Sequence, residues 1–168
     1  MDAGEKYWSV INPYWDAIEI DSAESFDRTF KTVPRNVGLL YAAHFCQSEV
    51  CNGGFTQFFW NSTGVLAPEA VEGFATIGQP KLGGVIEKAM LMLGLPYVRD
   101  RTVRWAAMER LHGDWQRTSL ERPRMKRVTS FEPLEQEFYA LLRSEAGGFE
   151  EAADRYAESI SATNVPPE

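Results

Sequence analysis

Apolar residues recur at intervals of three and four along most of the chain, which is the spacing of one face of an α-helix. Near the N-terminus this pattern is interrupted by Pro13. We therefore expect a short helix ending near Ile11 and a second beginning near Pro13, because proline suits the first helical turn. Asp21 and Glu24 have the spacing of a capping box, which predicts the start of a further helix. Its inward-facing side chains are expected to be Phe26, Phe30 and Val33.

The most strongly apolar part of the chain lies between Pro34 and a double glycine, Gly53-Gly54. It predicts a long buried helix, and the aromatic residues after the glycines continue the helical spacing to about Asn61. Two glycines between helical segments indicate a sharp turn of the backbone or a close approach to another backbone. The first segment is expected to place one stripe of side chains together: Leu40, Ala43, Gln47 and Val50.

The rest of the sequence predicts five further helices, each bordered by glycine, proline or polar residues. They occupy residues 68–77, 80–93, 101–115, 134–142 and 149–160. A basic loop is expected at 116–129, an acidic C-terminal helical region at 146–160 and a frayed tail at 161–168. No segment shows the period-two alternation of a β-strand. We therefore predict an all-α fold, a single compact domain of about eight helices over residues 1–168 with its core in 7–145.

Composition and cysteine usage are typical of a globular cytoplasmic protein. The chain of 168 residues is long enough for one core, and its hydrophobic content of 44 % argues against disorder. We find no charged-then-apolar leader and no apolar run long enough to span a bilayer, so we expect neither a signal peptide nor membrane association. Cys46 and Cys51 lie five residues apart in a predicted helix, which is poor disulfide geometry, so free thiols are expected.

The net charge of −7 is distributed unevenly. Residues 1–30 carry seven acids and two bases, whereas residues 31–98 carry four of each. Residues 99–128 carry nine bases against four acids, and residues 129–168 carry nine acids against two bases. Both ends of the chain are therefore acidic, and such asymmetry bears on partners and solubility rather than on the fold.

The residues that commonly carry catalysis or bind metals do not form a recognisable motif. His44, Cys46, Cys51 and His112 are the strong soft-metal ligands, but they lack the paired spacing of a zinc site. Gly53-Gly54 lacks the strand, third glycine and lysine of phosphate-binding loops, and no serine lies in a nucleophile elbow. We therefore predict a non-enzymatic protein without metal or cofactor.

Polar side chains surround the double glycine, and they allow two interpretations. Glu49, Asn52, Gln57 and Asn61 lie among aromatic residues, so they need internal hydrogen-bond partners if they are buried. One hypothesis is a ligand-binding or enzymatic pocket lined by Asn52, Gln57, Trp60 and Asn61. The other, which we favour, is a structural junction in which Gly53 and Gly54 let two helices meet. In that case Asn52, Gln57 and Asn61 are expected to satisfy backbone groups.

The acids near the two ends of the chain form a candidate binding surface. Four of them lie within nine positions of the last helix, and at 1.5 Å per residue they give roughly one charge per 3 Å, close to the phosphate spacing of one DNA strand. The alternative is that acidic helix faces only keep the protein soluble. The candidate residues are Asp16, Glu19, Asp21, Glu24, Asp27, Glu150, Glu151, Asp154 and Glu158.

The basic loop invites the opposite hypothesis of direct nucleic-acid binding. We expect instead that it pairs with the acidic helices of the same chain or of a second subunit, because the protein as a whole is acidic. Its cationic residues are Arg117, Arg122, Arg124, Lys126 and Arg127.

The sequence around the double glycine combines four short motifs in a long and unusual order. They are Asn52-Gly53-Gly54-Phe55, Gln57-Phe58-Phe59, Asn61-Ser62 with Gly64, and Ala67-Pro68-Glu69-Ala70. This order resembles the core of the bacterial DNA-mimic protein family, a helical domain long catalogued as of unknown function. Trp8 to Asp16, Ile77-Gly78 and the helix from Ile86 to Leu93 also fit, so the resemblance covers about residues 7–145.

The resemblance implies an all-helical, often dimeric protein with no known enzymatic activity. In a studied member of that family, an acidic surface imitates double-stranded DNA and occupies the DNA-binding site of a transcription repressor. For this chain it implies a cytoplasmic protein that binds a basic DNA-binding partner, with a homodimer as the expected assembly. A second possibility is an immunity- or antitoxin-type protein that neutralises a basic nuclease through the same acidic residues.

Overall fold

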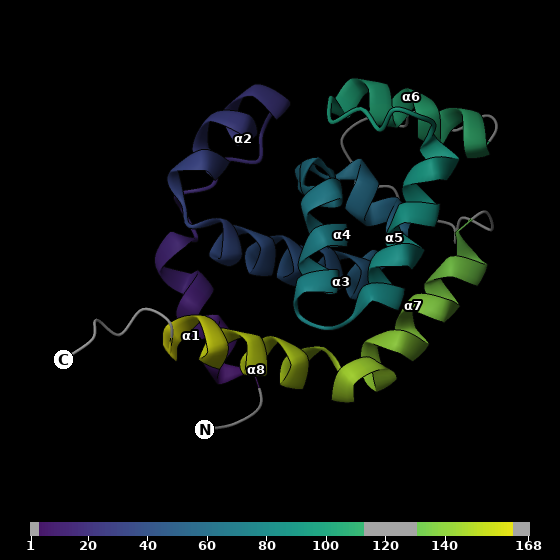
Figure 1. Ribbon diagram of the computed structural model, residues 1–168. Coiled ribbons are helices and arrows are strands. Elements are labelled where there is room, and N and C mark those ends of the chain that lie inside the picture. The colour runs from purple at the N-terminus through teal and green to yellow at the C-terminus, as the bar shows by residue number, and fades with distance from the viewer. Residues whose placement is uncertain (1–3, 113–130, 163–168) are drawn as a thin grey trace.

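The computed structural model describes residues 4–112 and 131–162. Within these ranges the protein has eight α-helices joined by short 3-10 helices and turns and has no strand, which confirms the predicted all-α fold (Figure 1). The helices are α1 (Glu5–Ile11), α2 (Ala23–Thr29), α3 (Arg35–Trp60), α4 (Ala67–Thr76), α5 (Pro80–Leu93), α6 (Arg101–His112), α7 (Glu132–Ser144) and α8 (Phe149–Ala162). None of the described helices is long and apolar enough to cross a bilayer.

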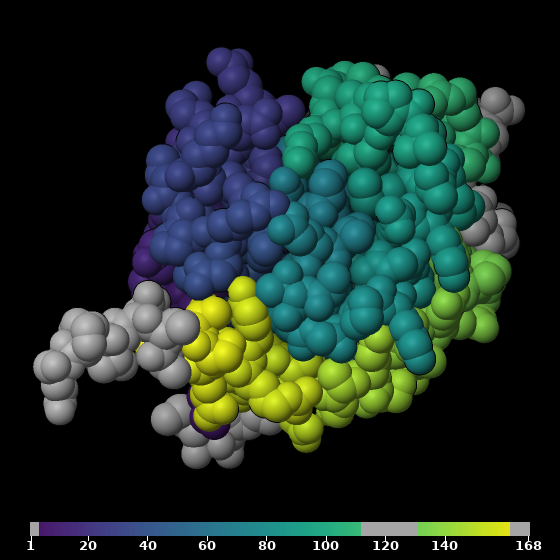
Figure 2. All heavy atoms as spheres, viewed as in Figure 1, coloured from purple at the N-terminus to yellow at the C-terminus, as the bar shows by residue number. Residues whose placement is uncertain are grey.

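The long helix α3 runs through the middle of the molecule, and the other helices pack around it (Figure 1). α1, α4, α6 and α7 contact α3, whereas α5 contacts α4 and α7, and α8 contacts α1. Figure 2 shows the described atoms as one continuous body with α8 along its lower edge. Every residue from Val37 to Ala43 is buried, which explains why this part of the sequence is apolar without interruption.

Aromatic rings fill the space between the helices. Burying one such ring favours the folded state by about 1.5–3 kcal/mol before the entropy of ordering the chain is counted. Rings from distant parts of the sequence meet there, so the core depends on all of the packed helices together. The fully buried phenylalanines are Phe26, Phe55, Phe58, Phe59, Phe74, Phe131 and Phe138.

The N-terminal region differs in two details from the sequence prediction. Pro13 does not begin a second α-helix but lies in a single 3-10 turn, Asn12–Tyr14, directly after α1. The N-cap of α2 is Ser22 rather than Asp21: Ser22 Oγ accepts the backbone N–H of Ser25 at 3.0 Å, and Ser25 Oγ accepts that of Ser22 at 3.2 Å. This capping box lies one residue later than predicted, and serine fills both of its positions.

The predicted helix boundaries in the middle of the chain are confirmed. Gly78 ends α4 with a φ of 91°, and α5 occupies the predicted segment and ends before Gly94. Gly83 lets α4 and α5 approach closely, because a Cβ there would lie 2.8 Å from the carbonyl oxygen of Val71. Gly84 has no such neighbour within 4 Å.

The predictions for the C-terminal third are tested only where the structure describes the chain. The last three residues of the helix predicted at 101–115 and the whole basic loop predicted at 116–129 lie outside the described residues. α8 extends to Ala162, so Ser161 and Ala162 are helical rather than part of a frayed tail, and residues 163–168 are again outside the described part.

Candidate functional site

The double glycine divides α3 into two helical segments. Gly53 has φ −154° and ψ 21°, and Gly54 has φ 73° and ψ −176°, so neither residue is helical. The conformation of Gly54 is one that residues with a Cβ rarely adopt. The predicted junction is therefore present as a sharp break inside one long helix, and it leaves backbone groups on both sides without their usual helical partners.

Helix α7 supplies partners for these backbone groups. The carboxylate of Glu135 accepts the N–H of Phe55 at 2.9 Å, and the hydroxyl of Tyr139 donates to the carbonyl of Val50 at 2.8 Å. Glu135 and Tyr139 are four residues apart, so both lie on the face of α7 that meets the junction. The carboxylate also stands at the start of the second helical segment, where a negative charge is favourable.

The polar cluster around the junction has Glu49 as its shared acceptor. Oε2 of Glu49 accepts the side-chain amide of Gln57 at 2.7 Å and that of Asn61 at 3.0 Å. Gln57 and Asn61 therefore bind the side chain of Glu49 on the other side of the break. This corrects the prediction that they satisfy backbone groups. Asn52 is exposed. Because Gln57 and Asn61 both donate to Glu49 within the protein, the geometry favours a structural junction over a ligand pocket.

Arginines from the start of the basic segment hold the end of α3. Arg104 is only 2 % exposed, and its guanidinium donates to the carbonyls of Phe59 at 3.0 Å and Asn61 at 2.8 Å. Burial lowers its pKa, but carbonyl groups at a helix C-terminus are favourable partners for a cation. Arg99 forms a bidentate pair with Glu69 at 2.7 Å. Sequence reasoning missed these roles, because the contacts join residues 30 to 45 positions apart.

The five N-terminal candidate acids are all exposed. They lie in and just before α2, and we refer to them as the N-terminal acidic group: Asp16, Glu19, Asp21, Glu24 and Asp27. Glu19 pairs with Arg28 at 2.9 Å. The other four have no ion pair among the described residues.

The four candidate acids of α8 do not share one environment. Glu150, Glu151 and Glu158 are exposed and form the C-terminal acidic group; Glu158 pairs with Lys6 of α1. Asp154 is buried, and its two oxygens accept the backbone N–H groups of Gly4 and Tyr7, both at 2.8 Å. Asp154 therefore holds the start of α1 inside the fold and does not belong to the predicted acidic surface.

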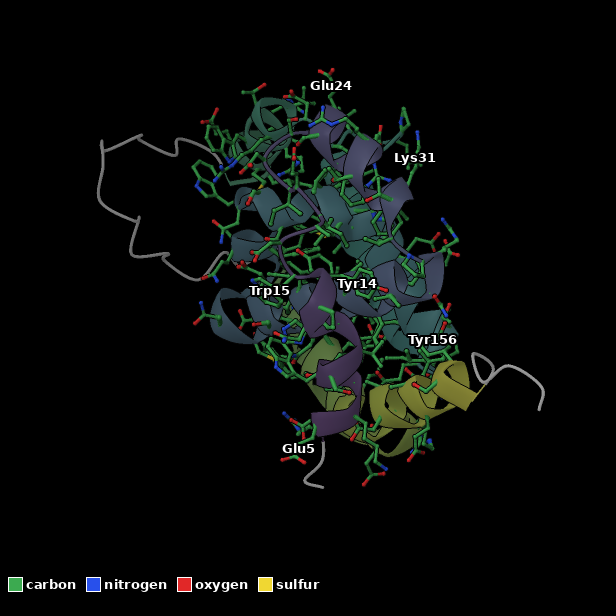
Figure 3. The ribbon with its side chains drawn as sticks, turned by 90° about the vertical axis from the view of Figure 1, so that its left-hand side faces the viewer. Glu5, Tyr14, Trp15, Glu24, Lys31 and Tyr156 are labelled. Carbon is green, nitrogen blue, oxygen red and sulfur yellow. The ribbon has the colours of Figure 1, made fainter. Side chains whose placement is uncertain are left out.

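The two acidic groups border the same side of the molecule at different ends. α2 lies at the top of this side and α8 at the bottom, and α1 runs beside α8 from the lower end towards the middle (Figures 1 and 3). Figure 3 shows Glu24 at the upper end and Glu5 at the lower end. The predicted acids thus form two separate clusters rather than one continuous stripe.

The candidate metal ligands are dispersed in the described part of the chain. Its residues contain no group of three or more histidines, cysteines and carboxylates that could hold a metal ion. Cys46 is buried and burial raises its pKa, whereas Cys51 is exposed, and both are free thiols. His44 lies among aromatic rings with Nδ1 at 3.3 Å from the Tyr7 hydroxyl, and burial lowers its pKa to about 4.

Comparison with known proteins identifies a family. A family model described as DMP19-like protein matches residues 31–160, which contain the glycine junction and the C-terminal acidic group. The N-terminal acidic group precedes the matched residues. No curated protein and no solved structure matches the chain.

Proposed function

The chain belongs to the family of DMP19-like proteins, and on that premise we propose that it binds a basic DNA-binding protein in place of DNA. In this proposal, exposed carboxylates occupy the positions that phosphates take on the partner's DNA-binding surface. The protein acts by competition and carries out no chemical reaction.

The observation that carries the proposal is the exposure of the N-terminal acidic group. Asp16, Asp21, Glu24 and Asp27 are exposed and have no ion pair among the described residues, so a partner's cations could reach them without breaking an internal contact. Such charges speed association and select a partner of opposite charge, although each contributes little to affinity.

Internal pairing of basic residues supports the same proposal. Arg99 and Arg104, which begin the basic segment, are engaged by Glu69 and by backbone carbonyls. These two arginines therefore do not neutralise the acidic groups. The cationic residues of the predicted basic loop at 116–129 lie outside the described residues. Among the described residues, three cations pair with members of the acidic groups: Lys6 with Glu158, Arg28 with Glu19, and Arg155 with Glu151.

The test is capture of a partner from the native host, followed by competition with duplex DNA. We expect a DNA-binding protein to be retained at low salt, released by duplex DNA, and lost steeply as ionic strength rises, because the exposed charges are then screened. The triple variant Asp16→Asn, Asp21→Asn and Asp27→Asn should retain less of it.

A variant with the same change in net charge elsewhere is the control. Glu87→Gln, Glu109→Gln and Glu137→Gln remove three charges from α5, α6 and α7 and should leave capture unchanged. Capture that is indifferent to salt, or equal loss in both triple variants, would remove the proposal. Capture of a basic nuclease would assign the chain to the immunity-type alternative.

A further inference from the structure

Between the two acidic groups lies a set of aromatic side chains that we call the aromatic patch: Trp8, Trp15, His44 and Phe45. The Trp8 ring centre is 5.3 Å from that of Trp15 and 5.2 Å from that of His44, and Trp15 is 4.8 Å from Phe45. These contacts hold Trp8 in place, yet 39 % of the residue remains exposed. Figure 3 shows Trp15 near the middle of this side, between Glu24 and Glu5.

The surroundings of Trp8 are acidic. Glu5 lies three residues before Trp8 on α1, which places both side chains on one face of the helix. Asp16 follows Trp15, and both Glu5 and Asp16 are exposed. Between residues 5 and 18 the one basic residue is Lys6, and its ammonium group is paired with Glu158.

His44 adds no positive charge to the patch at neutral pH. Burial lowers its pKa to about 4, so the imidazole stays neutral in the conditions where a partner would bind. An approaching cation therefore meets aromatic faces and carboxylates without repulsion from within the patch.

We propose that the exposed face of Trp8 receives an arginine side chain of the basic partner, while the acidic groups engage its other cations. The inference rests on the proposed function and names the residue at the centre of the contact. A rigid aromatic residue surrounded by charged residues is the arrangement in which binding energy concentrates at protein interfaces.

Arginine fits this position better than lysine. Its planar guanidinium stacks on aromatic faces and is less strongly hydrated than an ammonium group. The chain already makes such contacts internally: Cζ of Arg101 lies 4.9 Å from the centre of the Trp105 ring, and Cζ of Arg99 lies 5.0 Å from that of Phe26. Trp8 has the same chemistry available on a side that faces solvent.

The contact predicts a form of salt dependence that phosphate imitation alone does not. Charge pairs at an exposed interface weaken as salt screens them, whereas stacking of a guanidinium on a ring persists. Loss of the Trp8 ring should therefore lower affinity by a similar factor at low and high ionic strength. Loss of acids should lower it mainly at low ionic strength.

The probe is a blocked peptide of three arginines alternating with glycines, titrated into the full-length nitrogen-15-labelled protein. We expect the indole N–H signal of Trp8 to shift saturably, and to shift less with the matching lysine peptide. The signal of Trp105, whose ring already carries Arg101, should stay in place and is the internal control.

Affinity for the arginine peptide is then measured for two variants at two salt concentrations. Trp8→Leu should bind about three-fold more weakly at both concentrations. The variant with Asp16, Asp21 and Asp27 changed to Asn should lose affinity at low salt and approach the wild type at high salt. Trp8→Phe preserves most of the packing and should lie between Trp8→Leu and the wild type, which keeps the test valid if Trp8→Leu folds poorly.

The two proposals fail separately. The arginine contact is overturned if Trp8→Leu binds the peptide as tightly as the wild type, or if the Trp8 signal does not move. The proposed function survives that result if the acid variant still binds more weakly. Salt-independent capture of the native partner, or an acid variant that captures it as well as the wild type does, overturns the proposed function itself.

Discussion

Asp154 shows how one side chain can join the two ends of the chain. It is the buried acid of α8, and its two oxygens accept N–H groups from Gly4 and Tyr7 at the start of α1. The first N–H groups of a helix have no partner within that helix, so this carboxylate satisfies two groups that would otherwise depend on water. Lys6 and Glu158 add an exposed ion pair between the same helices.

Removing the Asp154 carboxylate should destabilise the protein more than removing an exposed acid of the same helix. We expect Asp154→Ala to lower the free energy of unfolding by about 2 kcal/mol, because two partly buried N–H groups lose their acceptor. Glu150→Ala, which has no such contacts, should change it by less than about 0.5 kcal/mol. Urea unfolding followed by circular dichroism measures both, and equal effects would contradict the capping role.

The pKa of His44 makes stability depend on pH. In the fold the pKa is about 4, whereas an unfolded histidine titrates near 6.5. Between these values His44 binds a proton in the unfolded chain but not in the folded protein. The free energy of unfolding is therefore highest above pH 6.5 and decreases as the pH falls towards 4. Below pH 4 both states are protonated and the effect ends.

Replacing His44 should remove this contribution. His44→Gln should lose less stability than the wild type between pH 6.5 and 4, with a difference in slope of at most about 1.4 kcal/mol per pH unit. Unfolding at a series of pH values measures the two slopes, and the difference between them cancels the titration of groups common to both proteins. Parallel curves would show that His44 is protonated as readily in the fold as outside it.

At the level of helices, the glycine junction gives α3 its shape. A Cβ at Gly54 would overlap the carboxylate of Glu135, and the positive φ of Gly54 is strained for any other residue. The same carboxylate holds the N–H of Phe55, so the glycine and its partner helix α7 are fitted to each other.

Two alanine substitutions should therefore have opposite effects. Gly54→Ala should lower the free energy of unfolding by about 2–4 kcal/mol through backbone strain and overlap with Glu135. Gly84→Ala should raise it by about 0.5–1 kcal/mol, because Gly84 is helical and has open space around it. Thermal and denaturant unfolding of both variants checks the sign. A neutral Gly54→Ala would show that the break does not require glycine.

The helices could be predicted from the sequence because each has an apolar stripe and a glycine or proline at its border. The junction at Gly53-Gly54 was predictable for the same reason. Its partners were not, because Glu135 and Tyr139 lie more than 80 residues further along the chain and nothing local marks them. The helical spacing of Asp154 likewise gave no sign that α1 packs beside it.

At the scale of the whole molecule, two acidic groups border one side with aromatic rings between them (Figure 3). The residues matched by the family model contain the C-terminal acidic group and not the N-terminal one. A partner that spans this side would touch both groups, whereas a partner recognised only by the family's shared region would depend on α8. The two groups can therefore be tested separately.

Neutralising each group alone and both together should reveal which arrangement holds. The N-terminal variant changes Asp16, Asp21 and Asp27 to Asn, and the C-terminal variant changes Glu150, Glu151 and Glu158 to Gln. If one partner covers both groups, each variant should bind it about ten-fold more weakly at low salt, from exposed pairs worth up to about 1 kcal/mol each. The combined variant should then lose about a hundred-fold, because distant contributions add in free energy.

Titration of the captured partner at several ionic strengths measures these factors and their salt slopes. A partner that touches both groups predicts a shallower slope for each single variant and the shallowest for the combined one, because fewer charges remain to be screened. A combined variant no weaker than the C-terminal one would place the partner on α8 alone. The aromatic patch would then lie beside the interface, and Trp8→Leu should bind the partner as the wild type does.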